Sequence, residues 1–271
     1  MSPRMVNRSM LIGGVMILLL IGMAVAAPFL APYDPMAIDL EGELEGPSSS
    51  HPLGQDKLGR DILSQILYGA RVSLGVAVLV VGFSVLVGTA LGAIAGYLGG
   101  AVDGMIMRVV DVLLAFPGIL LAIAITGILG PSLFNVILAL SLLGWVGYTR
   151  LVRGQVMAER NKEYVIAARA LGAGPLRVII CHILPNVMAP VIVEATFGMA
   201  GVILAESSLS FLGLGPQDVP TWGRLLQEGT QFLLFAPHVA TFPGVAIMVT
   251  VLGFNFLGDG LRDRLNVKRW A

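Results

Sequence analysis

Long stretches without charged residues constrain this chain more than any other feature. Residues 178–205 contain a single charged residue, Glu194, and four other stretches contain none: 9–33, 72–102, 112–149 and 229–258. A helix needs about 20 consecutive, mostly apolar residues to cross a bilayer. Every stretch meets this length, and 112–149 is long enough for two helices because Gly130 and Pro131 mark a turn in its middle. We therefore predict an all-α membrane protein with six transmembrane helices, at about 10–31, 73–97, 110–129, 133–152, 186–206 and 240–258.

The composition supports the same class. Of the 271 residues, 56% are hydrophobic and 13% are charged, whereas about 25% of the residues in a soluble domain are charged. The net charge of zero gives no reason to expect nucleic acid as a partner, so membrane lipid is the expected surrounding. Arg4 and Arg8 before an apolar run also resemble the start of a signal peptide. That run is long for such a peptide, so we expect the first span to be retained.

The distribution of Lys and Arg predicts the orientation of the spans. With the N-terminus inside the cell, 13 of the 17 cations fall on cytoplasmic segments and four on external ones. Cytoplasmic loops carry such an excess of cations, so we expect both termini to be cytoplasmic. Residues 1–71 then form an N-terminal span with an external segment, and residues 72–271 form the transmembrane core. Apolar residues at helical spacing over 56–68 predict a short helix on the membrane surface before the second span.

Sequence signals of an enzyme are missing. No Gly-Lys dipeptide occurs, so the chain lacks the P-loop that binds ATP phosphates. His51, His182, His238 and the single Cys181 do not have the spacing of metal ligands. We therefore expect no catalytic residue, metal or cofactor in this chain. Glu194 is the one carboxylate well inside a predicted span, and it is either a charge in a transport path or a side chain paired within the bundle.

A basic segment over residues 153–185 separates the fourth and fifth predicted spans. Four of its residues recur at helical spacing and form a narrow apolar stripe: Tyr164, Ala167, Ala168 and Leu171. Small residues in the stripe allow close approach of a partner, although a helix that touches only lipid headgroups is the alternative. Gly172 and Pro175 end this helix and turn the chain, and Pro185 is expected to open the fifth span.

The same segment resembles the EAA loop of ABC importer permeases, written Glu-Ala-Ala, three residues, Gly, nine residues, Ile-x-Leu-Pro. Ile166 stands at the Glu of this pattern and His182 at its Ile, and five residues match: Ala167, Ala168, Gly172, Leu184 and Pro185. Glu163 and Arg169 belong to the form Glu-Tyr-Val-x-Ala-Ala-Arg-Ala-Leu-Gly, which is typical of peptide and nickel importers. The resemblance implies that six residues couple the chain to an ATPase: Glu163, Ala167, Ala168, Arg169, Gly172 and Pro185.

Other segments resemble the same family in order along nearly the whole chain. The sequence His-Pro-Leu-Gly-Gln-Asp-Lys-Leu-Gly-Arg-Asp over 51–61 is similar to the external signature of dipeptide, oligopeptide and nickel permeases. Its characteristic residues are His51, Gly54, Asp56, Gly59, Arg60 and Asp61. Segments 209–215 and 254–263 are similar to later parts of these proteins. The length and the short first loop resemble the "C" permease, which pairs with a "B" permease.

The resemblance implies a type I ABC importer permease fold with cytoplasmic coupling helices, in a bacterial or archaeal cytoplasmic (inner) membrane. The expected partners are a second homologous permease, two ATPase subunits that bind ATP and Mg²⁺, and an extracytoplasmic solute-binding protein. The expected function is import of di- and oligopeptides. A nickel-chelate or other small-solute ABC importer is the alternative. An ion-coupled secondary transporter is a third reading, which the scarcity of intramembrane charge opposes.

Overall fold

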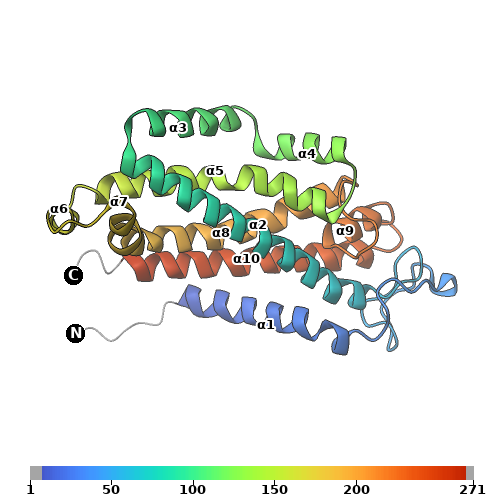
Figure 1. The fold of residues 1–271 in the computed structure, drawn as a ribbon. Helices are drawn as coiled ribbons and strands as arrows, with labels where there is room; N and C mark the ends of the chain where they lie inside the picture. The colour runs from blue at the N-terminus through green and yellow to red at the C-terminus, as the bar shows by residue number, and fades with distance from the viewer. Residues whose placement is uncertain (1–7, 267–271) are drawn as a thin grey trace.

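The computed structural model describes residues 8–266, and the regular structure in this range is helical apart from one bridge between Gln55 and Asp61 (Figure 1). Five long helices run alongside one another: α1 Arg8–Leu30, α2 Ile62–Leu98, α5 Leu133–Glu159, α8 Leu184–Phe211 and α10 His238–Asn266. Seven shorter elements connect or flank them: η1 Leu40–Gly42, α3 Gly100–Leu114, α4 Gly118–Leu129, α6 Glu163–Ala170, α7 Pro175–Arg177, η2 Val178–Ile183 and α9 Trp222–Thr230.

The expected third span is not one continuous helix. Five helices are each long and apolar enough to cross a membrane, and the pair α3–α4 passes the same test only as a broken span bent by 79°. The break lies at Pro117, which lacks an N–H and has ψ 119°, outside the helical range. The residue before a proline is also disfavoured in helical conformation, so α3 ends before Phe116. The six predicted spans are therefore confirmed as five helices and one bent pair.

The second span begins earlier than predicted. Residues 56–61 are not helical, and α2 then runs without interruption from Ile62 to Leu98. Asp61 caps its first turn, because the carboxylate accepts a hydrogen bond of 2.7 Å from the Ser64 amide. The separate surface helix expected over 56–68 is thus wrong: its second half forms the first two turns of α2. Residue 71, the expected boundary between the two parts of the chain, lies inside this helix.

Helices α2 and α5 pack at backbone contact through glycines one helical turn apart. A Cβ atom on Gly92 would lie 2.6 Å from the Thr149 carbonyl oxygen, and one on Gly96 would lie 2.8 Å from that of Arg153. Such distances admit only glycine. Gly88 adds a third such position one turn earlier. Small residues spaced in this way allow close approach of helices in membranes, so α2 and α5 pack with their backbones in contact.

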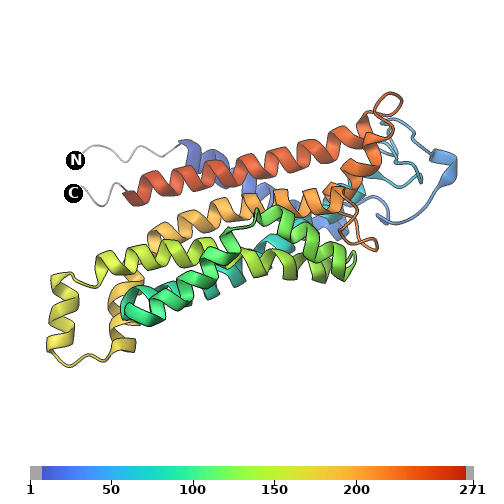
Figure 2. The same cartoon turned by 90° about the horizontal axis from the view of Figure 1, so that it is seen from above.

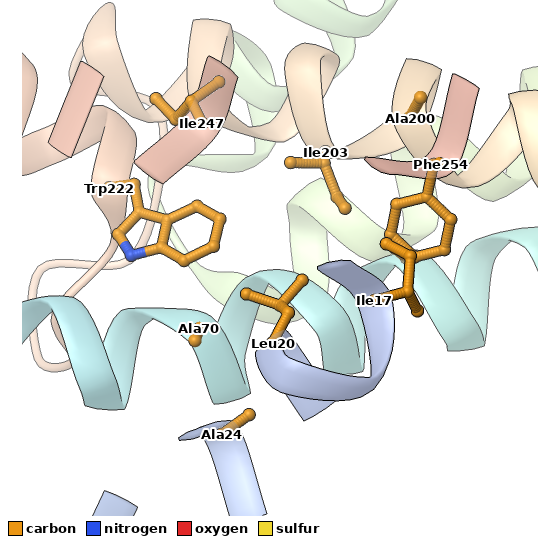
Figure 3. Packing of buried hydrophobic residues seen from close by; sticks show 10 residues of the cluster. Ile17, Leu20, Ala24, Ala70, Ala200, Ile203, Trp222, Ile247 and Phe254 are labelled. Carbon is orange, nitrogen blue, oxygen red and sulfur yellow. The ribbon is translucent and has the colours of Figure 1, made fainter. Parts of the chain in front are cut away.

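A buried cluster joins α1, α2, α8, α9 and α10 (Figure 3). Trp222, at the start of α9, is 1% exposed, and its indole N–H donates to the Ile66 carbonyl oxygen at 3.0 Å. Ile203 of α8 and Leu20 of α1 are also buried in this cluster. The cluster therefore fixes the short helix α9 against the long helices.

The fifth span also starts earlier than predicted. The chain becomes helical at Pro175 and remains so to Phe211, through a π-helical segment, η2. Pro185 stands at the start of α8, as expected, but the span does not begin there, because α7 and η2 precede it in one helical run. Pro185 directly follows the π-helical segment, and the Asn186 side chain donates to the His182 carbonyl oxygen at 2.7 Å. An added side-chain donor and a π-helical turn are the usual means by which a helix tolerates an internal proline.

Candidate functional site

The chain between α5 and α8, residues 160–183, projects from one end of the bundle (Figures 1 and 2). Helix α6 lies at its tip, at the end of the molecule where α1 begins and α10 ends. Helix α9 and the connection between α1 and α2 lie at the opposite end. We call residues 160–183 the α5–α8 connection and residues 31–61 the α1–α2 connection.

Helix α6 divides its predicted stripe between the protein and the solvent. Ala168 is 8% exposed, and Val165 is fully buried with Val178 and Ile183. Tyr164, Ala167 and Leu171 are exposed, Leu171 at 89%. Ala168 therefore packs against the rest of the chain, whereas Tyr164, Ala167 and Leu171 form an exposed apolar surface at the tip. Glu163 in the first turn, Arg169 in the last turn and Gly172 after the helix are exposed, as is Pro185 in α8.

Gly172 ends α6 with φ 87°, a left-handed conformation that residues with a Cβ rarely adopt. Its amide donates to the Arg169 carbonyl oxygen at 2.9 Å. The glycine predicted from the sequence to stop this helix therefore does so for a conformational reason.

A hydrogen-bonded chain fixes the start of α6. The Tyr164 hydroxyl donates to Glu159 Oε2 at 2.6 Å, and Lys162 Nζ lies 2.6 Å from Glu159 Oε1. Asn186 of α8 donates in turn to the Tyr164 oxygen at 3.3 Å. Burial, with the Glu159 carboxylate as a further cause, raises the pKa of Tyr164 to about 12. The phenol therefore remains a hydrogen-bond donor at any physiological pH.

Two arginines connect the α5–α8 connection to the end of α2. Arg160 Nη1 donates to the carbonyl oxygen of Gly96 at 2.9 Å and to that of Tyr97 at 3.4 Å. The last carbonyl groups of a helix have no partner within it, and a cation there is favourable. The Arg169 guanidinium lies over the Tyr97 ring, 4.9 Å from its centroid. Arg169, predicted from the sequence to contact a partner, therefore contacts the chain itself.

A third arginine connects α5 to α3. Arg153 Nε lies 2.5 Å from Asp103 Oδ1, and Arg153 Nη2 lies 2.7 Å from Asp103 Oδ2. This bidentate geometry fixes the relative orientation of both groups. The two residues are 50 positions apart, and no sequence pattern links them.

At the opposite end, the six residues of the predicted external motif come together. Asp56 accepts from the Arg60 side chain at 2.6 Å and from Gln65 at 2.8 Å. The His51 ring nitrogen lies 3.0 Å from Asp61 Oδ1. All the carboxylates and guanidinium groups in this set are buried. Gly54 and Gly59 have φ of 82° and 69°, which explains glycine at both turns. This motif builds a folded loop that holds the start of α2.

Glu228 of α9 completes this cluster, a role that no sequence pattern predicts. Its carboxylate lies 2.7 Å from Arg60 Nη2 and 3.0 Å from Arg224 Nε. The burial and hydrogen bonding of Glu206 of α8 were likewise not predicted. It is fully buried and accepts hydrogen bonds from Ser210 at 2.7 Å and Ser73 at 3.2 Å. In sequence, Glu206 appears only as an acidic residue at a predicted span end and Glu228 only as one between two predicted spans, without the partners that the fold supplies.

A cavity of about 330 Å³ lies between α2, α4, α5 and α8. Five of its wall residues are glycines: Gly118, Gly144, Gly147, Gly198 and Gly201. Glu194, the candidate path charge, lies on the wall and is exposed, and Tyr148 donates to its backbone carbonyl at 3.4 Å. The structure therefore puts Glu194 at a hollow in the membrane-spanning part and does not pair it within the bundle interior.

Comparison with known proteins identifies the family. Residues 88–270 match the model of the binding-protein-dependent transport system inner membrane component, and residues 5–47 match the N-terminal transmembrane domain of oligopeptide transport permease C. The chain is 46% identical to a dipeptide transport system permease protein of Alkalihalophilus pseudofirmus, over 97% of this chain and 86% of that protein. It is 46% identical to a glutathione transport system permease protein of Pectobacterium atrosepticum, over 94% and 85% of the two chains.

A solved structure supports the fold. The chain resembles the inward-facing methionine ABC transporter MetNI with a TM-score of 0.61 and 17% identity, over 75% of this chain and 97% of the other. The arrangement of helices is therefore that of a type I ABC importer permease. This chain belongs to the family of inner-membrane components of binding-protein-dependent transport systems, the permease subunits of ABC importers.

Proposed function

We propose that this chain forms half of the translocation path of an ATP-driven importer of di- and oligopeptides. The observation that carries the substrate class is the relationship to permeases named for dipeptides and for glutathione, at 42–46% identity over most of the chain. The cavity between α2, α4, α5 and α8 supports the role of the chain as part of a path. Its wall is mostly apolar and glycine-rich, and such a surface offers weak contacts to many different side chains.

The projecting α5–α8 connection is the proposed ATPase-docking site. An exposed apolar surface at its tip is formed by Tyr164, Ala167 and Leu171. Contiguous exposed apolar surface usually marks a site at which another protein binds. Glu163, beside this surface, adds a charge for orientation of the partner. Two ATPase subunits with ATP and Mg²⁺, one for each of two permeases, would supply the energy. Under this proposal α6 and both termini lie in the cytoplasm, the orientation that the cation asymmetry predicts.

At the opposite end, the α1–α2 connection and α9 form the proposed docking region for an extracytoplasmic solute-binding protein. The buried cluster of Asp56, Arg60 and Glu228 holds this region rigid, which suits a surface that must receive a partner in one orientation. A second, homologous permease would enclose the cavity from the side on which Glu194 is exposed.

Uptake in cells tests the substrate class. The gene is deleted in a strain that lacks other peptide importers, and accumulation of labelled di- and tripeptides is compared with accumulation of nickel. We expect deletion to abolish peptide uptake, and a plasmid copy to restore it. Loss of nickel accumulation with unchanged peptide uptake would instead show a nickel-chelate importer.

A further inference from the structure

Tyr97 is held by two arginines of the α5–α8 connection, one on its backbone and one on its ring. Arg160 donates to the carbonyl oxygens of Gly96 and Tyr97, and Arg169 lies over the Tyr97 ring at 4.9 Å. Arg160 is the residue that ends α5, and Arg169 lies in the last turn of α6. The first residue of the α5–α8 connection and the last turn of its helix α6 therefore both contact Tyr97 of α2.

The position of Tyr97 links this contact to the cavity. It lies one residue before the end of α2, and the turn into α3 is made by Gly99 and by Gly100, the first residue of α3, which have φ of 68° and 55°. At its start, α3 is held to α5 by the ion pair between Asp103 and Arg153. Beyond the break at Pro117, the first residues of α4, Gly118 and Ile119, line the cavity wall. A displacement of the α2–α3 corner can therefore reach the cavity wall in two ways: along the chain through α3 to α4, and through the ion pair between α3 and α5.

We propose that Tyr97 is a positioning residue for transport. Through Arg169 and Arg160 it receives the displacement of α6 and passes it to the α2–α3 corner, and so to the wall of the cavity. This inference rests on the proposed function. It assigns Arg169 an internal role and leaves the docking contact with the ATPase to Tyr164, Ala167 and Leu171. The cation–π contact orients Arg169 over the Tyr97 ring but contributes little free energy, so it can break and re-form during each transport cycle.

The chain contains a matched control for this contact. At the other end of the same helix, the Arg71 guanidinium lies over the Tyr68 ring, 5.7 Å from its centroid. Tyr68 and Tyr97 are both partly buried, so the same substitution removes the same kind of group from each. Only Tyr97 contacts the α5–α8 connection.

The experiment uses the complete complex in proteoliposomes, with the number of peptides imported per ATP hydrolysed as the readout. Tyr97→Leu keeps an apolar side chain and removes the ring face, whereas Tyr97→Phe and Tyr97→Trp keep it. Loss of an exposed cation–π contact changes an equilibrium constant by a factor of about two to five. We therefore expect Tyr97→Leu to lower the number of peptides imported per ATP by about the same factor. Tyr97→Phe and Tyr97→Trp should keep the wild-type ratio of peptides imported per ATP, and so should the control Tyr68→Leu.

Three results would overturn the inference. The first is a normal ratio in Tyr97→Leu. The second is an equal loss in Tyr97→Leu and Tyr97→Phe. The third is a loss in Arg169→Gln that adds fully to that of Tyr97→Leu, because residues that act through one contact are not additive. Size-exclusion chromatography separates these results from poor assembly, since the ATPases must co-elute with each variant. A wild-type complex that imports no peptide would contradict the proposed function, not the role of Tyr97.

Discussion

Arg60 and Glu228 are 168 positions apart in sequence, yet their side chains form an ion pair of 2.7 Å in which both groups are almost fully buried. Arg60 precedes α2 and Glu228 lies in α9, so the pair joins the α1–α2 connection to the second half of the chain. A buried charge without its partner is costly, which makes this contact a test of how the end of the bundle formed by the α1–α2 connection and α9 is held.

Glu228→Gln should destabilise this end. The amide keeps the shape of the carboxylate and removes its charge from Arg60, which retains Asp56 as a partner. We expect a loss of about 1–3 kcal/mol in the free energy of unfolding, the usual range for a hydrogen bond to a charged group. Thermal unfolding of the purified permease measures this loss of stability, and the rate of protease cleavage within residues 31–61 reports whether the α1–α2 connection has loosened. Arg224→Gln removes a more exposed partner of the same carboxylate and should have a smaller effect; equal effects would contradict the assignment.

The ion pair between Asp103 and Arg153 should hold α3 to α5 through its charges. Asp103→Asn keeps the shape, and because both side chains are partly exposed we expect a loss of only about 0.5–1 kcal/mol. The reversed pair, Asp103→Arg with Arg153→Asp, should recover part of the melting temperature that either reversal alone removes. No recovery in the double variant would show that the two residues act separately.

The proposed orientation can be tested with the native thiol. Cys181 is exposed in the α5–α8 connection, so a membrane-impermeant maleimide should not reach it in intact cells and should label it after lysis. In a Cys181→Ser background, Glu45→Cys and Asp218→Cys should be labelled in intact cells. Labelling of Cys181 before lysis would reverse the topology.

A charge on the tip of α6 should uncouple the ATPase. Ala167→Asp introduces a carboxylate into an exposed apolar surface, where docking would bury it without a partner. We expect the permease to reach the membrane at a normal level and solute-stimulated ATP hydrolysis to fall at least tenfold. Ala37→Asp makes the same change at an exposed residue of the α1–α2 connection, at the opposite end of the bundle, and should leave co-elution of the ATPases with the permease unchanged. Normal stimulation in Ala167→Asp would remove this surface from the docking site.

The sequence predicted the long helices well because their apolar runs are bounded by charges and turns. It did not predict the break in the third span, because Pro117 lies within an unbroken apolar run and composition alone cannot locate a bend. It placed the start of the fifth span at Pro185, since a π-helical turn before a proline has no compositional signal.

The contacts of the site were less predictable than its segments. The sequence located both candidate segments, and the resemblance implies that Arg169 couples to an ATPase. The structure adds a contact that the sequence did not predict, because the Arg169 guanidinium lies over the Tyr97 ring. Helical periodicity gives the face of α6 on which a residue lies, not which neighbouring helix covers that face. The pairs Arg60–Glu228, Arg153–Asp103 and Arg160–Gly96 each join residues 50 or more positions apart, so only the fold brings them together.

Peptide import by the reconstituted complex tests the central claim most directly. The permease is assembled with its second permease, the ATPases and the solute-binding protein in proteoliposomes, and labelled tripeptide uptake is measured with and without ATP on the side of α6. The account predicts uptake that requires ATP and that Ala167→Asp abolishes. Uptake that persists without ATP and follows an imposed proton gradient would contradict it and would indicate an ion-coupled transporter.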